Sequence, residues 1–204
     1  MSESFREFYL KRHPDMRQIF QVIEEMSVRT SENRDLLNNN DENLYITQYV
    51  VKKGEHIDNY VYNHNDLEVY KYDPFQMESE EIKLWFVVNK QITVAKVDFF
   101  VNGSAIIIND ANARNRGFER IMQHIYTDYF LRKYKQIISD NSHTDNGFYF
   151  YRNMLEDKER LGIVMTVLNY ETKQEIPLND ASELINYFGE KSEFLKYRFV
   201  IRKK

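Results

Sequence analysis

The chain has 204 residues, of which 42% are hydrophobic and 15% aromatic, which is enough to build one core. Its 28 basic and 32 acidic residues give a formal net charge of -4, which argues against direct nucleic-acid binding and against attraction to an anionic membrane. The absence of cysteine excludes disulfides and thiolate catalysis, and the five histidines are too scattered for a structural zinc site, so we expect no metal.

Residues 1–43 predict a helical segment followed by a polar connector. Residues 4–12 can form a short helix, and Pro14 suits the first turn of a second helix. Residues 30–43 are polar and lack periodicity, which indicates a connector. The opening residues lack the continuous apolar stretch of a secretory signal, and no run approaches membrane-spanning length, so we expect a cytoplasmic protein.

The next part of the chain is rich in tyrosine. Residues 44–52 alternate β-branched and aromatic side chains and predict a strand, while residues 54–81 are polar, with one strand expected near Val69. Tyrosine offers a large contact area with a polar tip and is enriched at protein interfaces. Six tyrosines therefore form a candidate protein interface: Tyr45, Tyr49, Tyr60, Tyr62, Tyr70 and Tyr72. The alternative is that they cover a sheet edge within the molecule.

Residues 84–108 carry the clearest strand pattern. Three β-rich runs, 84–88, 92–101 and 105–108, are joined by Asn89-Lys90 and by Asn102-Gly103. Asn-Gly is a strong hairpin signal because both residues tolerate positive φ. We therefore predict an antiparallel meander, on which Asp98 is an acidic residue flanked by apolar neighbours.

The hydrophobic period then changes to that of a helix. Apolar and aromatic side chains from Phe118 to Phe130 share one face of a helix that we expect to end near Tyr134. A short strand at 136–139 follows, and Thr144 or Asp145 can cap a helix that continues to Leu155. Strands at 163–168 and 197–201 complete an α+β order of three strands, helix, strand, helix and two strands.

These elements resemble the GNAT acetyltransferase fold. The resemblance rests on the meander, the segment Arg114-Asn115-Arg116-Gly117 before a helix, the strand Ile137-Ile138-Ser139 and the helix ending Tyr151-Arg152-Asn153-Met154-Leu155. The segment Ser139-Asp140-Asn141 through Thr144 and Gly147 to Tyr151 is more narrowly similar to bacteriophage-encoded GNAT-like proteins. The match covers residues 84–203 and implies a mostly antiparallel central sheet flanked by helices over residues 44–204, with residues 1–43 as an extra helical segment.

The resemblance also implies candidate site residues. In a working GNAT enzyme one strand is splayed, and a loop before a helix presents backbone amides to the pyrophosphate of acetyl-CoA. Matching positions here are Arg114, Arg116, Gly117 and Phe118, but Glu119 places a carboxylate where a small residue is needed, which argues against a cofactor. Tyr151 stands where such enzymes keep a tyrosine that protonates the departing thiolate. The alternative is that Tyr151 is an amphipathic core residue.

Three functions remain open. The favoured hypothesis is a non-catalytic GNAT-like fold, without cofactor, that binds and modulates a host protein such as the transcription machinery or a defence complex, in the bacterial cytoplasm if the protein is phage-encoded. The alternative is an acetyl-CoA-dependent N-acetyltransferase with Tyr151 as general acid. A second alternative is a virion or assembly component.

Overall fold

The computed structural model describes residues 37–73, 80–114, 117–118, 120–140, 145–188 and 194–204. The helices expected within residues 4–26 and most of the polar connector lie outside these residues. Among the helices that the structure describes, none combines the length and the apolar character needed to cross a membrane.

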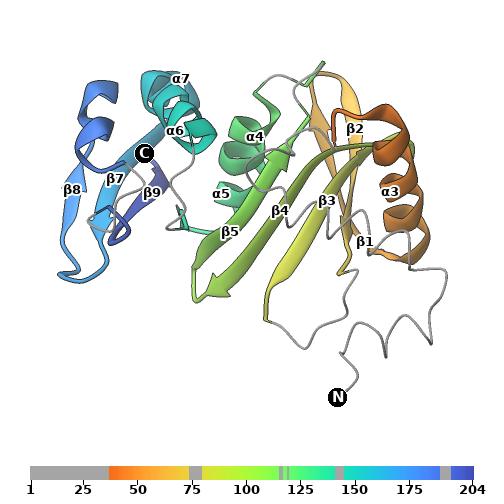
Figure 1. Cartoon of the computed structure of the whole chain (residues 1–204), viewed down its shortest axis with the longest axis horizontal. Coiled ribbons are helices and arrows are strands. Elements are labelled where there is room, and N and C mark those ends of the chain that lie inside the picture. The colour runs from red at the N-terminus through yellow and green to blue at the C-terminus, as the bar shows by residue number, and fades with distance from the viewer. Residues whose placement is uncertain (1–36, 74–79, 115–116, 119, 141–144, 189–193) are drawn as a thin grey trace, which may run out of the picture. The chain divides into compact units, whose positions relative to one another are not determined.

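A single mixed sheet of nine strands runs through the described residues (Figure 1). Its strand order is β1-β2-β3-β4-β5-β6-β9-β7-β8. β5 and β6 pair in parallel, whereas β6 with β9, β9 with β7, and β7 with β8 pair antiparallel. The strands are β1 Glu55–Tyr62, β2 Asn65–Lys71, β3 Ile82–Val88, β4 Ile92–Asn102, β5 Ala105–Ala113, β6 Gln136–Ile138, β7 Ile163–Asn169, β8 Glu175–Pro177 and β9 Tyr197–Lys203.

Helices precede the sheet and connect its later strands. They are α3 Asn40–Lys53, α4 Ile121–His124, the π-helix η2 Ile125–Phe130, α5 Leu131–Lys133, α6 Asp145–Glu156, α7 Lys158–Leu161 and the 3-10 helix η3 Ala181–Asn186. α4, η2 and α5 follow one another without a break and form the long helix that the sequence predicts. This helix begins at Ile121 and not at Phe118, because Arg120 has a left-handed backbone with φ of 66°.

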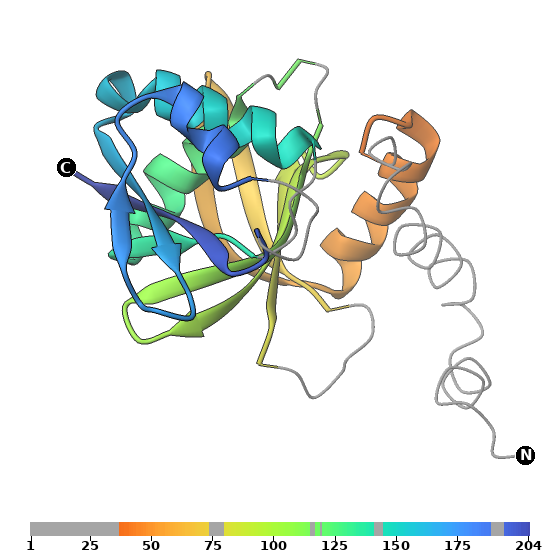
Figure 2. The same ribbon diagram turned by 60° about the vertical axis from the view of Figure 1, so that its left-hand side comes forward.

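The predicted α+β class, with a mostly antiparallel sheet flanked by helices, is confirmed. All three strands of the meander are present, and Gly103 has the positive φ expected of its turn, 58°. The predicted strands β6, β7 and β9 and the helix α6 are also present. Figure 2 shows the β7–β8 hairpin beside β9, in agreement with the antiparallel pairing of β7 with both strands.

The strand expected at residues 44–52 is wrong, because these residues lie in α3. Asn39 caps this helix by accepting a hydrogen bond from the Asp41 amide, and the last turn carries two lysines. Its buried side chains recur at helical spacing, at Asn43, Ile46, Thr47 and Val50. The β-branched and aromatic composition therefore misled the interpretation, and the period of burial decides the element.

The unassigned stretch that follows forms the β1–β2 hairpin. Asn63 and His64 turn the chain with φ of 46° and 65°, which both residue types tolerate. β2 includes Val69, so the strand expected there is confirmed. β1 has a register shift between His56 and Asp58, and this irregularity hides its alternation in the sequence.

The described chain divides into two compact units that interleave along the sequence. Of the described residues, the first comprises 37–73, Leu84–Ala95, 112–114 and 117–118, and the second 80–83, Lys96–Ala111, 120–140, 145–188 and 194–204. The first unit has a core in which Ile46 and Val50 of α3 pack with Trp85 and Val87 of β3. In the second unit Phe99 packs edge to face on Phe130, with ring centroids 5.1 Å apart.

Candidate functional site

The candidate site begins where β5 and β6 part. The parallel pairing covers only Ala105–Ile107 of β5 against Gln136–Ile138 of β6. β5 then continues to Ala113, whereas β6 ends at Ile138. The parallel pairing is therefore three residues long. Ser139 and Asp140 follow directly after the last paired residue of β6.

Ser139 fixes the chain at this point. Its backbone amide donates to the carbonyl of Phe199, at 2.8 Å, and its hydroxyl accepts from the Phe199 amide, at 2.9 Å. The same hydroxyl donates to the carbonyl of Asp140, at 2.9 Å. A short polar side chain thus extends the pairing with β9 by one residue and orients Asp140.

Tyr151 lies in α6, close to these residues. Its ring stacks on Phe199, with centroids 4.8 Å apart, so the core role considered for it is real. Burial raises the pKa of its phenol well above the ordinary value, and the charge of Asp140 raises the pKa further, while a hydrogen bond with Ser139 lowers it in part. The phenol therefore keeps its proton at neutral pH and can act as a donor.

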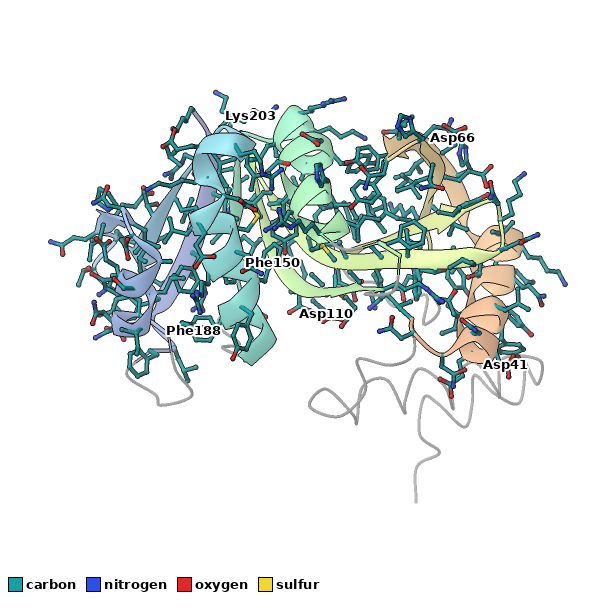
Figure 3. All side chains as sticks on the ribbon, turned by 90° about the horizontal axis from the view of Figure 1, so that it is seen from above. Asp41, Asp66, Asp110, Phe150, Phe188 and Lys203 are labelled. Carbon is teal, nitrogen blue, oxygen red and sulfur yellow. The ribbon has the colours of Figure 1, made fainter. Side chains whose placement is uncertain are left out.

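A second buried phenol, Tyr126, belongs to the π-helix. Burial raises the pKa of Tyr126, and Tyr151, Asp140 and Asp110 add to the shift in that order. Its ring meets Phe150 of α6 edge to face, at 5.0 Å, and Figure 3 labels Phe150 and Asp110. The helical pattern placed Tyr126 on the inner face but gave no sign of a π-helix, a distortion that often accompanies functional sites.

The loop expected to hold a cofactor belongs to the other unit. Arg114 is only 8% exposed, and its amide donates to the Val94 carbonyl at 2.8 Å. Its guanidinium donates to the carbonyl of Leu37 and to Oδ1 of Asn40, each at 2.8 Å. These bonds hold the chain before α3, so Arg114 does not fit the role of a phosphate ligand.

The remaining loop residues differ in what the structure describes. Gly117 is exposed with φ of 79°, and a Cβ added there would meet no atom within 4 Å. This open position fits the close approach of a phosphate group. Phe118 is half-buried, whereas Arg116 and Glu119 lie outside the described residues. The fit to acetyl-CoA therefore rests on Gly117 and Phe118.

The candidate tyrosine interface is corrected for four of its six members. Tyr60, Tyr62, Tyr70 and Tyr72 are buried, at 4–9% exposure, and a buried ring offers no surface to a partner. Tyr70 and Tyr72 pack in the core that α3 forms with Trp85 of β3. Tyr60 meets Phe86 of β3 edge to face, so these rings are covered within the molecule, as the alternative interpretation expected. Tyr45 and Tyr49 of α3 are half-buried and lie 5.1 Å apart.

Asp98, which the sequence places between apolar neighbours, is a buried acid with a charged partner. It is 6% exposed and pairs with Lys96, two residues away on the same strand. The sequence did carry a signal for this pair, because residues 96 and 98 are two apart and share one face of a strand. Among the described residues, no group of three or more histidine or acidic side chains could hold a metal ion.

Comparison with known proteins gives similarities of shape. No family model matches the sequence, and no curated protein matches it. A chimeric spermidine N-acetyltransferase from Vibrio cholerae SpeG and hSSAT has 12% identity and a TM-score of 0.36, over 62% of this chain and 68% of that one.

Two further solved structures are similar over more of the chain. Tetrahymena GCN5 has 11% identity and a TM-score of 0.33, over 84% of this chain and 90% of that one. A GNAT-family acetyltransferase from Elizabethkingia anophelis, solved with acetyl-CoA bound, has 12% identity and a TM-score of 0.33, over 86% and 93%. At these TM-scores, no substrate, cofactor or partner of this chain follows from the likeness.

Proposed function

We propose that this protein is an N-acyltransferase that moves an acyl group from acyl-CoA to an amine. The observation that carries the proposal is the end of the β5–β6 pairing beside Tyr151, a buried phenol that stacks on Phe199 and has Ser139 as its polar neighbour. The bound donor would supply a thioester, whose thiolate leaves as the new amide forms. Such a leaving group needs a proton donor that is still protonated at neutral pH.

The residues around Tyr151 suit this role. The stacked Phe199 ring fixes the orientation of the tyrosine, and burial keeps the phenol protonated until a base appears next to it. Ser139, held by two hydrogen bonds to Phe199, is the polar neighbour that can orient the phenolic hydroxyl. Arg114, whose guanidinium donates to Leu37 and Asn40, is left as a support of the chain at the start of α3.

Tyr151→Phe tests the proposal. The variant keeps the ring and its stacking, so we expect acetyl-CoA to bind as before in calorimetry while the rate of acetyl transfer to an amine falls by about 10²–10⁴-fold. Tyr149→Phe is the matched control, because Tyr149 lies two residues away on α6 and is 58% exposed. Equal rates for the wild type and the Tyr151 variant would contradict the proposed role.

A second candidate function is supported by Arg114. Its amide and guanidinium are used within the fold, as expected of a GNAT-like fold that has lost its cofactor and acts by binding a protein. The target would be a host protein of the transcription machinery or of a defence complex, in the bacterial cytoplasm, if the protein is phage-encoded.

Calorimetry with acetyl-CoA separates the two functions. Binding that is lost in Gly117→Val supports the acyltransferase, because the added side chain would fill the open position beside the loop. No binding at millimolar acetyl-CoA contradicts the acyltransferase and supports the protein-binding function, whose partner a pull-down with the full chain would then identify.

A further inference from the structure

A cluster of charged side chains lies on β3, β4 and β5, and one of its members, Asp110, also adds to the raised pKa of Tyr126. The ammonium of Lys96 contacts Oδ2 of Asp98 at 2.6 Å and Oδ2 of Asp110 at 3.5 Å. The Lys96 and Asp98 side chains are only 13% and 8% exposed. Glu81 and Lys83 pair at 3.4 Å at the start of β3, and the Glu81 carboxylate accepts from the Asn109 amide.

The second oxygen of Asp98 sets this cluster apart from an ordinary ion pair. Among the described residues, Oδ1 of Asp98 is buried and has no hydrogen-bond partner. A buried carboxylate oxygen without a donor is costly, and native structures retain few such atoms. Lys96 does not relieve this cost, since it contacts the other oxygen.

The electrostatics of the cluster follow from burial. Burial raises the pKa of Asp98 to about 6, Lys96 and Lys83 oppose this shift, and Asp110 adds to it. Burial lowers the pKa of Lys96, but Asp98 and Asp110 together outweigh it and raise that pKa. Lys96 therefore stays charged, while Asp98 exchanges its proton near neutral pH.

We propose that Asp98 and Asp110 form a binding site for the primary ammonium group of a small ligand. A carboxylate oxygen only accepts hydrogen bonds, so the missing partner of Oδ1 must be a donor. The five charged side chains named above are three carboxylates and two ammonium groups, which favours a cation over an anion.

Asp110 provides the entrance to this site. Its side chain is 47% exposed, whereas that of Asp98 is 8% exposed, so the cluster meets solvent at Asp110. The ligand ammonium would share Asp110 with Lys96, whose contact there, at 3.5 Å, is longer than its 2.6 Å contact with Asp98, and would donate to Oδ1 of Asp98. The site stands independently of acyl transfer, and if the proposed function holds, its ligand would be the acceptor amine.

Carbon-13 NMR of the aspartate carboxyl groups in the full chain tests this site. The probe is n-butylamine, and n-butanol is its uncharged control. We expect n-butylamine to lower the midpoint of the Asp98 titration by about one pH unit, which corresponds to a tenfold preference for ionised Asp98. We expect n-butanol to leave this midpoint unchanged. Asp98→Asn should weaken n-butylamine binding at least tenfold, whereas Asp157→Asn, on a surface ion pair with Arg160, should not.

Two outcomes would overturn the site. One is an Asp98 titration that n-butylamine leaves unmoved, or that n-butanol moves equally, as expected if a buried water satisfies Oδ1. The other is n-butylamine binding that Asp98→Asn does not weaken. If that variant fails to fold by circular dichroism, the titration of the wild-type carboxyl decides alone. Because no acyl donor is present, failure of acyl transfer leaves this result untouched.

Discussion

Burial has opposite consequences for the two most distinctive acids of this molecule. Tyr151 starts from a high ordinary pKa, so raising it further keeps the phenol protonated throughout the physiological range. Asp98 starts from a low ordinary pKa, so raising it to about 6 moves the carboxyl into that range. The same physical effect therefore makes Tyr151 a fixed donor and Asp98 a group that titrates.

The shift at Asp98 predicts a pH dependence of stability. Its folded-state pKa is about 6 and the ordinary value is 3.8, so the folded state binds the proton more tightly. The stabilisation is fully present below the ordinary value and is lost as pH rises through about 6. As pH rises from 4 to 7, we expect the wild type to lose about 2 kcal/mol of unfolding free energy relative to Asp98→Asn. Urea titration of both proteins at each pH measures the difference. A difference that does not vary with pH would contradict the shift.

A side chain substituted at Gly103 would strain the backbone without meeting a neighbouring atom. The φ of Gly103 is 58° and a Cβ added there would meet no atom within 4 Å, so a substitution causes no clash. Gly103→Val should still lower the free energy of unfolding by about 1–2 kcal/mol, because a β-branched residue resists a left-handed backbone. Gly103→Asn, which tolerates this conformation, should cost much less. Equal thermal stability of both variants and the wild type would contradict this origin of the strain.

At the scale of elements, a buried polar network attaches α3 to β4. Asn43 of α3 donates through Nδ2 to the carbonyls of Leu37 and Thr93, each at 2.7 Å, and its Oδ1 accepts from the Thr93 amide at 2.8 Å. Thr47 adds a contact between its hydroxyl and that of Thr93, at 2.9 Å. The helix is thus placed by hydrogen bonds as well as by its apolar side chains.

Removing Asn43 tests this attachment. Asn43→Ala leaves buried carbonyl and amide groups without partners, so we expect the free energy of unfolding to fall by about 3 kcal/mol. Gln48→Ala, on the exposed side of the same helix, controls for the change in helix propensity and should have little effect. Urea unfolding of both variants gives the comparison, and a similar loss in each would show that the network contributes little.

The sequence predicts best the elements whose signals are local. The meander follows from turn residues and alternation, and α6 and β7 follow from period and length, so all of them are confirmed. α3 was misread because composition and burial period disagree there, and only its packing on Trp85 resolves the disagreement. Tyr151 could be singled out by resemblance, but its contact with Ser139 and Phe199 depends on residues far apart in the chain.

At the scale of the whole molecule, the two compact units share their strands. β4 belongs to the first unit up to Ala95 and to the second from Lys96, and β5 passes from the second unit at Ala111 to the first at Asn112. If one unit unfolded, its part of β4 would be released. The other unit would then lose the support of the adjoining part of the same strand. This covalent sharing predicts that the units unfold together.

The single tryptophan makes cooperative unfolding measurable. Trp85 is buried in the first unit, where its indole N–H donates to the Tyr72 carbonyl at 2.9 Å, so its fluorescence reports that unit. Met154 is fully buried in α6 of the second unit, and Met154→Ala should cost about 2–5 kcal/mol through lost burial and a cavity. We expect the midpoints of Trp85 fluorescence and of far-ultraviolet circular dichroism to shift to lower urea together. If circular dichroism shifts while the fluorescence midpoint stays in place, the units unfold separately and the shared strands do not couple them.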